Sequence, residues 1–307
     1  MTRPKSVAVT GASGYVGQFV CRGLAAAGYR VTGLSRRPHT QDRFGVSRWL
    51  RGDLANASSR SALLDQLLDG QQALVHCALA HEPGRYRGGE GGDPSAFWER
   101  NLLPGLALLD RAAAHGVQRV LFMSSRAVFD GLPAQSTPLA DDSPVRPTTH
   151  YGALKAAEEA LIAAAPADGP VCTALRLTGV YGCIEPVEDS KWMALIRDAL
   201  GGATPPEARL ASEVSGVDVA SAVGILLAAA EGEVRGRVFN CADRLVSRRE
   251  VLALVAQQTG RSLELPEVGV PPARIMDCDG LRSLGWEPGG DKELTATVFA
   301  LVARVPQ

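Results

Sequence analysis

The 307-residue sequence lacks several features that mark particular classes of protein. It has no apolar run of the roughly 18 to 20 residues that a membrane helix needs. Its formal net charge is −1, which gives no electrostatic reason to expect nucleic acid or an anionic membrane as partner. The first residues enter a strand pattern almost at once, which leaves no room for a signal peptide. We therefore expect a cytoplasmic globular protein whose partner is a small molecule.

Cysteine, histidine and lysine are sparse and scattered. The six cysteines contain no C-x-x-C pair and the five histidines show no ligand spacing, so we expect neither disulfides nor a metal site. The basic residues are almost all arginine, and the lysines are Lys5, Lys155, Lys191 and Lys292. In such a chain, a lysine indicates a position where arginine would not serve.

The pattern of apolar segments predicts an α/β fold. Short apolar runs that read as strands lie at residues 6–10, 30–34, 49–50, 73–77, 119–123 and 171–177. Helical patterns lie between them, at residues 15–27, 97–114 and 151–165. Strands that are apolar on both faces and alternate with helices are typical of a Rossmann-type, doubly wound parallel sheet.

The regular alternation fades after Tyr181, where glycine, proline and charged residues become frequent. We therefore predict a dinucleotide-binding Rossmann domain over residues 1–181, with returning segments near residues 211–241. Residues 182–307 are then mainly a smaller, irregular C-terminal lobe that binds substrate.

A glycine-rich turn follows the first predicted strand and opens the first predicted helix. Gly11 permits the tight turn, Gly14 lets the backbone approach a pyrophosphate, and Gly17 lets the helix pack closely on the sheet. The helix N-terminus then offers amide donors to an anion. The alternative, a glycine turn without a ligand, is disfavoured by this strand–turn–helix context. The turn residues predicted to bind the cofactor are Gly11, Ser13, Gly14, Tyr15, Val16 and Gly17.

The end of the second strand predicts the type of dinucleotide. An acidic residue there binds the ribose of NAD, whereas arginine accommodates the 2′-phosphate of NADP. This chain has Ser35, Arg36 and Arg37 and no carboxylate, which favours NADP, with NAD as the alternative. Two solvated arginines on a loop are the structural alternative. After the third strand, Asp53 could accept a bond from the adenine amino group or simply cap a turn.

Tyr151 and Lys155 lie four residues apart, on one face of a predicted helix. A free phenol has a pKa near 10, and a neighbouring ammonium stabilises its phenolate. Such a phenol can exchange a proton with a substrate hydroxyl while hydride moves to or from a nicotinamide. Ser124 and Ser125 end the fifth strand, at the sheet edge where such folds bind ligands. An ordinary surface pair and two turn serines are the alternatives.

Taken in their order, these motifs resemble the extended short-chain dehydrogenase/reductases, the NAD(P)-dependent epimerase/dehydratase group. The resemblance covers nearly the whole chain. It includes Asn101, which matches a helix asparagine of the group, and residues 176–182 (RLTGVYG), which are similar to its R-x-x-N-V-Y-G segment. Residues 217–220 (VDVA) and 284–288 (LGWEP) are similar to its V-D-V-A and L-G-W-x-P segments.

The resemblance implies roles for individual residues. Ser125 would orient the reacting oxygen, Tyr151 would exchange its proton, and Lys155 would tune Tyr151 and hold the nicotinamide ribose. Further cofactor contacts implied by the resemblance fall on Asp53, Leu54, Cys77, Ala78 and Asn101, together with Tyr151 and Lys155. The group commonly pairs helices between subunits, so we expect a homodimer formed by the helices at residues 97–114 and 151–165.

Departures from the group's pattern bear on the substrate. Arg126 and Ala127 stand where sugar-nucleotide 4,6-dehydratases carry an acid–base pair for water elimination, which argues against that reaction. Gly179 stands where nucleotide-sugar enzymes often place an asparagine, which argues against such a substrate without excluding it. We predict Arg126, Gly179 and Lys191 as substrate-binding positions.

The sequence thus predicts an NAD(P)-dependent oxidoreductase or epimerase that acts on a hydroxyl or carbonyl of a sugar-like or small hydroxy/keto substrate. It does not separate reductase from epimerase, nor does it give the substrate, direction or stereochemistry. A non-catalytic NADP-binding redox sensor is the alternative from another class. Such a sensor would not need Ser125, Tyr151 and Lys155 together.

Overall fold

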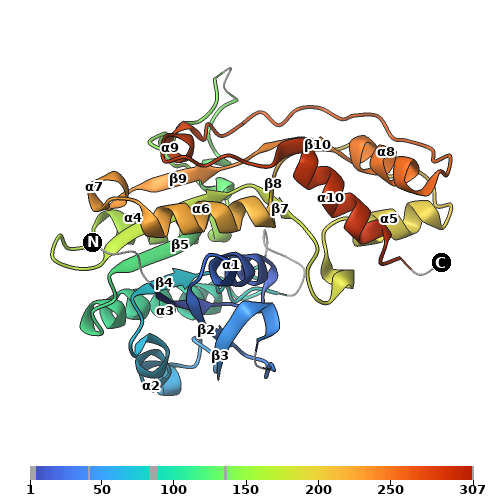
Figure 1. The fold of residues 1–307 in the computed structure, drawn as a ribbon. Helices are drawn as coiled ribbons and strands as arrows, with labels where there is room; N and C mark the ends of the chain where they lie inside the picture. Colours follow the sequence, from blue (N-terminus) through green and yellow to red (C-terminus); the bar gives the residue numbers. More distant parts are fainter. Residues whose placement is uncertain (1–4, 41, 83–88, 135–136, 306–307) are drawn as a thin grey trace.

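A computed structural model describes residues 5–40, 42–82, 89–134 and 137–305, and its centre is a seven-stranded parallel sheet (Figure 1). The strand order is β3-β2-β1-β4-β5-β6-β9. The strands are β1 (Ser6–Thr10), β2 (Arg30–Ser35), β3 (Val46–Arg51), β4 (Ala73–His76), β5 (Arg119–Ser125), β6 (Val171–Leu177) and β9 (Val238–Cys241). This confirms the predicted Rossmann-type sheet. The strand order reverses between β1 and β4, and doubly wound sheets bind ligands at such a point.

Helices cover both faces of this sheet (Figure 1). One face packs against α1 (Tyr15–Ala26) and α6 (Gly216–Ala228), which lie side by side. The other packs against α2 (Ala57–Leu68), α3 (Pro94–Ala114) and α4 (His150–Ala163). In β1, Val7 and Val9 belong to the first core and Ala8 to the second. Because both faces are buried, the strands read as continuous apolar runs.

A second, smaller sheet has the order β10-β8-β7. It consists of β7 (Gly179–Tyr181), β8 (Leu210–Ser215) and β10 (Arg244–Ser247). A separate apolar core joins it to α5 (Met193–Leu200), α8 (Arg248–Thr259) and α10 (Gly290–Val302), near the C-terminus in Figure 1. Residues 211–241 were predicted to return to the first domain. Of these, β9 is a strand of the main sheet and α6 packs against that sheet, whereas β8 belongs to the small sheet. Among the described helices, none is long and apolar enough to cross a membrane.

Two segments that are distant in sequence meet at the start of α6. The Ser215 hydroxyl caps this helix by accepting from the Asp218 amide at 2.9 Å. Asp218 in turn accepts from the Trp286 indole through its carbonyl oxygen at 3.0 Å, and from the Gly289 amide through its carboxylate at 2.9 Å. The VDVA and LGWEP segments therefore hold the C-terminal part of the chain against the main sheet.

Candidate active site

The glycine turn lies directly after β1 and leads into α1. Gly11 has a positive φ of 64°, and its carbonyl oxygen accepts from the Gly14 amide at 2.9 Å. A Cβ on Gly11 would stand 2.8 Å from backbone atoms of Ala78, and a Cβ on Gly17 would overlap the Gly11 carbonyl. Gly14 is the residue before α1, and because glycine has no side chain it does not cap the helix. The turn is therefore tight, and α1 begins without a side-chain cap, which is typical of a helix N-terminus that receives an anion.

The loop after β4 faces this turn across the reversal of strand order. The buried side chain of Asn101 on α3 holds the loop, because its Nδ2 donates to the Ala80 carbonyl at 2.9 Å and its Oδ1 accepts from the Ala80 amide at 2.7 Å. Nδ2 also donates to the Phe97 carbonyl at 2.8 Å. Asn101 thus shapes the backbone beside the turn. Burial raises the pKa of the neighbouring Cys77 thiol to about 12, so that thiol stays protonated.

Ser35, at the end of β2, forms a polar cluster with the glycine turn. Its hydroxyl lies 2.9 Å from the Ser13 hydroxyl, accepts from the Arg37 amide at 3.1 Å and lies 3.0 Å from Nε2 of His39. The side chains of Arg36 and Arg37 are exposed. The His39 ring lies 4.4 Å from the Trp49 ring, so the cluster has an aromatic wall that the sequence did not predict.

Asp53 and Leu54 follow β3. The exposed Asp53 carboxylate accepts from the Ala55 amide at 2.9 Å, which is the turn geometry considered as its alternative role. Leu54 is buried in the core beneath α2. Contacts of these two residues with a cofactor stay predictions, as does that of Val16, which packs partly against the first core.

Tyr151 and Lys155 occupy the first two turns of α4, whose N-terminus is capped by the Thr149 hydroxyl. Lys155 is buried, and its Nζ donates to the Glu158 carboxylate at 2.8 Å. Burial alone would lower the pKa of Lys155, but Glu158 and then Tyr151 raise it above its usual value. The amine therefore stays charged at neutral pH.

His76 ends β4 near the Lys155 ammonium. Burial lowers the pKa of this histidine to about 3, and Lys155 contributes to the same shift. Its Nδ1 lies 2.7 Å from the Thr10 hydroxyl at the end of β1. A neutral imidazole thus connects the strand that carries the glycine turn with the surroundings of Lys155.

The two serines at the end of β5 differ in their surroundings. Ser125 is half-buried, and its hydroxyl accepts from the Ala127 amide at 3.2 Å, which caps the short 3-10 helix η2 (Arg126–Phe129). Its hydroxyl proton remains available to another acceptor. Ser124 is buried and donates instead to Glu159. Of the two, Ser125 is the more exposed at the carboxyl edge of the sheet, and its contact with a ligand stays a prediction.

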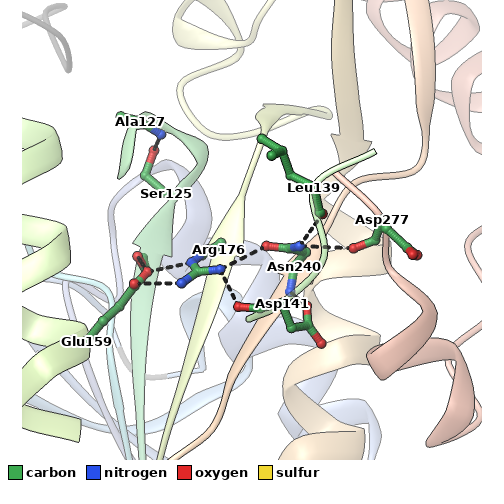
Figure 2. A network of polar contacts seen from close by, with 9 residues as sticks. Ser125, Ala127, Leu139, Asp141, Glu159, Arg176, Asn240 and Asp277 are labelled. Atoms are coloured by element: carbon green, nitrogen blue, oxygen red, sulfur yellow. Dashed lines mark hydrogen bonds and ion pairs between the residues drawn. The ribbon is translucent and has the colours of Figure 1, made fainter. Parts of the chain in front are cut away.

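A buried network holds this edge in place, as Figure 2 shows. The Arg176 guanidinium binds both carboxylate oxygens of Glu159, at 2.8 and 2.9 Å, and donates to the Asp141 carbonyl at 2.7 Å. It also lies 4.7 Å from the centre of the Phe129 ring. Bidentate arginine–carboxylate pairs fix geometry well. Glu159 therefore joins α4 to β6, directly beneath the end of β5.

The first turns of α1, directly after the glycine turn, contact the segment that follows β7. The Tyr15 hydroxyl donates to the Gly182 carbonyl at 3.1 Å and accepts from the Lys191 amide at 3.1 Å. On the next turn of α1, Gln18 donates to the Glu185 carbonyl at 2.7 Å and accepts from its amide at 2.9 Å. The backbone of Lys191, a predicted substrate-binding residue, thus contacts the side chain of the first residue of α1.

Lys191 and Gly179 come together around a carboxylate that the sequence did not predict. The Lys191 ammonium forms an ion pair with Glu213 of β8. A Cβ on Gly179 would overlap both charged groups, so the glycine makes room for the pair. Burial lowers the pKa of Lys191 and raises that of Glu213, and each partner opposes the shift of the other.

A pocket of about 360 Å³ opens beside this pair. Its lining is mixed in charge, with three basic residues (Lys191, Arg209 and Arg248) and two acidic residues (Asp198 and Glu213). The guanidinium groups of Arg209 and Arg248 are of a type that binds anionic groups. The third predicted substrate-binding residue, Arg126, forms an ion pair with Asp130 at 3.5 Å.

The sequence analysis missed two candidate functional residues, the buried acids Glu158 and Glu213. Glu158 lies three residues after Lys155, and this spacing on a helix places two side chains on one face. That spacing was the available signal. Glu213 carried no comparable signal, because its partner Lys191 is 22 residues away in the chain.

Comparison with known proteins matches this architecture. The chain is 33% identical to a UDP-glucose 4-epimerase of Corynebacterium glutamicum over 57% of its own length and 52% of that protein. It is 28% identical to a dTDP-6-deoxy-L-talose 4-dehydrogenase (NAD(P)(+)) of Kitasatospora kifunensis, over 94% of this chain and 92% of that protein. The chain spans about half the length of the first curated relatives it matches.

Solved structures are similar over nearly the whole chain. One is MoeE5 in complex with UDP-glucose and NAD, at 28% identity and a TM-score of 0.74, covering 97% of this chain and 99% of that one. A UDP-glucose 4-epimerase of Thermus thermophilus in complex with NAD shares the fold, with a TM-score of 0.76 and 24% identity over 98% and 100% of the two chains. The model of the NAD dependent epimerase/dehydratase family matches residues 7–242. The chain belongs to that family, as its motifs predicted.

Proposed function

We propose that this protein is an NAD(P)-dependent oxidoreductase or epimerase that acts on a hydroxyl or carbonyl group of a sugar-like substrate. The observation that carries the proposal is the placement of Lys155. It lies one helical turn after Tyr151, buried and charged, and its charge helps to lower the pKa of His76 at the end of β4. A phenol, an ammonium and a dinucleotide cradle thus meet at one edge of the sheet.

The cradle fits a nicotinamide dinucleotide. A Cβ at position 11 or 17 would overlap backbone atoms of the turn or of the loop after β4, so both glycines keep the turn tight. In addition, α1 begins without a side-chain cap, as a helix N-terminus that binds a pyrophosphate does. When bound, the nicotinamide accepts or gives hydride. Tyr151 exchanges a proton with the substrate oxygen, and Ser125 holds that oxygen by its free hydroxyl proton. Lys155 stabilises the deprotonated form of Tyr151 by its charge.

We propose that the substrate carries an anionic group that binds in the pocket beside Lys191 and Glu213. Arg209 and Arg248 line this pocket, and arginine binds phosphate with bidentate geometry. The relatives named above act on, or are bound to, nucleotide-linked sugars, and the phosphates of such a substrate are groups that these two arginines can bind. At position 179 this chain has a glycine beside the Lys191–Glu213 ion pair, so the side of the pocket formed there differs from one that carries an asparagine side chain.

We propose NADP as the preferred cofactor. Ser35 offers a hydroxyl, and Arg36 and Arg37 are exposed cations directly after β2, where a 2′-phosphate would lie. NAD is the alternative, and it is the dinucleotide bound in the similar solved structures.

We further propose a two-fold symmetric homodimer. Its support is α3, which exposes Leu103 and Leu106 (47% and 36%) next to α4. Light scattering at micromolar concentration should give twice the mass of one chain, and a monomer throughout would refute the dimer.

The Tyr151→Phe variant tests the function. It keeps the ring and its packing but removes the exchangeable proton, so turnover should fall by roughly 10²- to 10⁴-fold. Binding of NADPH, followed by fluorescence, should stay within about twofold of the unchanged protein. Substrates should be screened as free sugars, sugar acids and nucleotide sugars, with product analysis because an epimerase leaves the cofactor spectrum unchanged. Full turnover in Tyr151→Phe would refute Tyr151 as the proton-transfer group, whereas binding of cofactor without turnover of any screened substrate by the unchanged protein would support the redox-sensor alternative.

A further inference from the structure

His39 is a half-buried histidine on the loop after β2, and the proposed function gives it no role. Its Nε2 lies 3.0 Å from the hydroxyl oxygen of Ser35, the last residue of β2. The centre of its ring lies 4.4 Å from that of Trp49 and 6.2 Å from that of Phe44. Aromatic packing therefore holds the ring at the end of β2, where the adenosine ribose of a dinucleotide binds in this type of fold.

The imidazole of His39 is neutral at neutral pH. Burial lowers the pKa of His39 below its ordinary value, and the positive charges of Arg43 and Arg37 lower it further. A neutral imidazole has one nitrogen that donates a hydrogen bond and one that accepts. The effect of His39 on Ser35 therefore depends on which nitrogen carries the proton.

The surroundings of the two ring nitrogens assign the proton to Nε2. Among the residues that the structure describes, Nδ1 of His39 is buried and has no hydrogen-bond partner. A proton on Nδ1 would be a buried donor without an acceptor. Orphaned buried N–H groups are rare in proteins, and under-satisfied acceptors are less so. A proton on Nε2 is instead donated to the Ser35 hydroxyl oxygen.

This proton makes the Ser35 hydroxyl a donor only. A serine hydroxyl has one proton and two lone pairs. The Arg37 amide donates to one lone pair at 3.1 Å, and Nε2 of His39 donates to the other at 3.0 Å. The hydroxyl proton is left for the Ser13 hydroxyl oxygen, 2.9 Å away, or for an oxygen of a ligand. Ser35 therefore offers a ligand a proton and no lone pair.

We infer that His39 is a positioning residue that selects for a 2′-phosphate by keeping the Ser35 hydroxyl a hydrogen-bond donor. Phosphate oxygens are strong acceptors, so they match a hydroxyl that only donates. The 2′-hydroxyl of NAD has a proton to donate, and NAD sites provide a carboxylate for it. Neither lone pair of Ser35 is left to accept that proton. This role of His39 rests on the proposed preference for NADP.

The test compares the affinities of adenosine 2′,5′-bisphosphate and adenosine 5′-monophosphate, which differ only in the 2′-phosphate. Calorimetry on the whole protein at neutral pH gives both dissociation constants and their ratio. His39→Phe keeps a ring against Trp49 but has no donor at the place of Nε2. The ratio in favour of the bisphosphate should fall about five- to tenfold, because the Ser35 hydroxyl can then rotate and accept.

Two results in a folded His39→Phe variant would overturn the inference. An unchanged ratio, with or without equal weakening of both ligands, would show that the ring only supports the loop. A raised ratio would show that Nε2 competes with the phosphate for the Ser35 proton. Should His39→Phe not fold, His39→Leu replaces it with the same expectations. His39→Gln can donate from its amide near the place of Nε2, so it should keep the ratio within about twofold, and a ratio as low as in His39→Phe would overturn the inference.

Ser35→Ala separates an effect through Ser35 from a direct contact with the phosphate. This variant should itself lower the ratio, and adding His39→Phe to it should cause no further fall. Additive falls would show that His39 contacts the phosphate directly, which would overturn a positioning role.

His115→Phe is the matched control, because His115 is also half-buried but bonds Asp65 at the end of α3. It should leave the ratio unchanged, and a fall equal to that in His39→Phe would refute the specific role of His39. If the unchanged protein binds the two ligands equally, the preference for NADP is refuted together with that role. If it prefers the bisphosphate and His39→Phe does so equally, the role of His39 alone is refuted.

Discussion

The carbonyl oxygen of Gly11 occupies the place that a Cβ on Gly17 would need. The Gly17→Ala variant must therefore push α1 away from the turn. We expect a loss of about 1 to 3 kcal/mol in the free energy of unfolding and at least tenfold weaker dinucleotide binding. Denaturant unfolding and cofactor fluorescence measure the two effects.

Gly224→Ala is the control for this variant. Gly224 lies inside α6 with open space around its Cα, so a methyl group there meets nothing. Alanine should leave binding unchanged and stabilise the helix by roughly 0.5 to 1 kcal/mol. Equal losses in both variants would show that the turn has no special need for glycine at position 17.

Arg36→Ala tests the proposed preference for NADP. Loss of a charge-assisted contact to the 2′-phosphate should weaken NADPH binding by about 1.5 to 3 kcal/mol and leave NADH binding nearly unchanged. Arg48→Ala is the control. Arg48 is also exposed, but it lies on β3 opposite Thr32, in the middle of β2 rather than at its carboxyl end. If the unchanged protein bound NADPH and NADH equally well, the preference would be refuted.

The buried His76 predicts a loss of stability in mild acid. Its pKa is about 3 in the folded protein, below the ordinary value of 6.5. The unfolded chain therefore binds the extra proton first, so the contribution is complete above pH 6.5 and is lost as the pH falls from there toward 3. Between pH 6.5 and 5 this loss amounts to about 2 kcal/mol.

Urea unfolding at several pH values measures this dependence. His76→Asn keeps an oxygen for the Thr10 hydroxyl but cannot titrate, so its stability should fall less steeply over the same range. Parallel slopes in the two proteins would contradict a neutral, buried His76.

Gly179→Ala tests the space that the Lys191–Glu213 pair occupies. The added Cβ would overlap both charged groups, so the buried pair must separate. We expect a loss of about 1 to 3 kcal/mol in unfolding free energy and a higher KM with a smaller change in kcat. Gly232→Ala, at a position with open space, is the control. A KM equal to that of the unchanged protein would show that the Lys191–Glu213 pair has no part in substrate binding.

The main sheet could be predicted because its strands are buried on both faces and read as apolar runs. Ser124 and Ser125 were predicted to end the fifth strand, and β5 includes both. They pair with Arg176 and Leu177 of β6. Two turn serines were the alternative, because polar strand residues that form hydrogen bonds inside the protein resemble turn residues in the sequence.

The small sheet and Glu213 were beyond the reach of sequence patterns. β7 has only three residues, and β8 contains a glutamate whose partner comes from another segment. Burial of an acid depends on a cation brought near by the fold, which no local periodicity records. Glu158 was closer to prediction, since its partner lies on the same helix.

The side chain of Asn240 has a consequence for the order in which the chain folds. Its Nδ2 donates to the Leu139 carbonyl at 2.9 Å and to the Asp277 carbonyl at 3.0 Å (Figure 2). These acceptors lie 101 residues before it and 37 residues after it. During synthesis, the bond from Asn240 to Asp277 can therefore form only after residue 277 has left the ribosome. Contacts of such long range form slowly, so this edge of the sheet should be among the last regions of a new chain to become ordered.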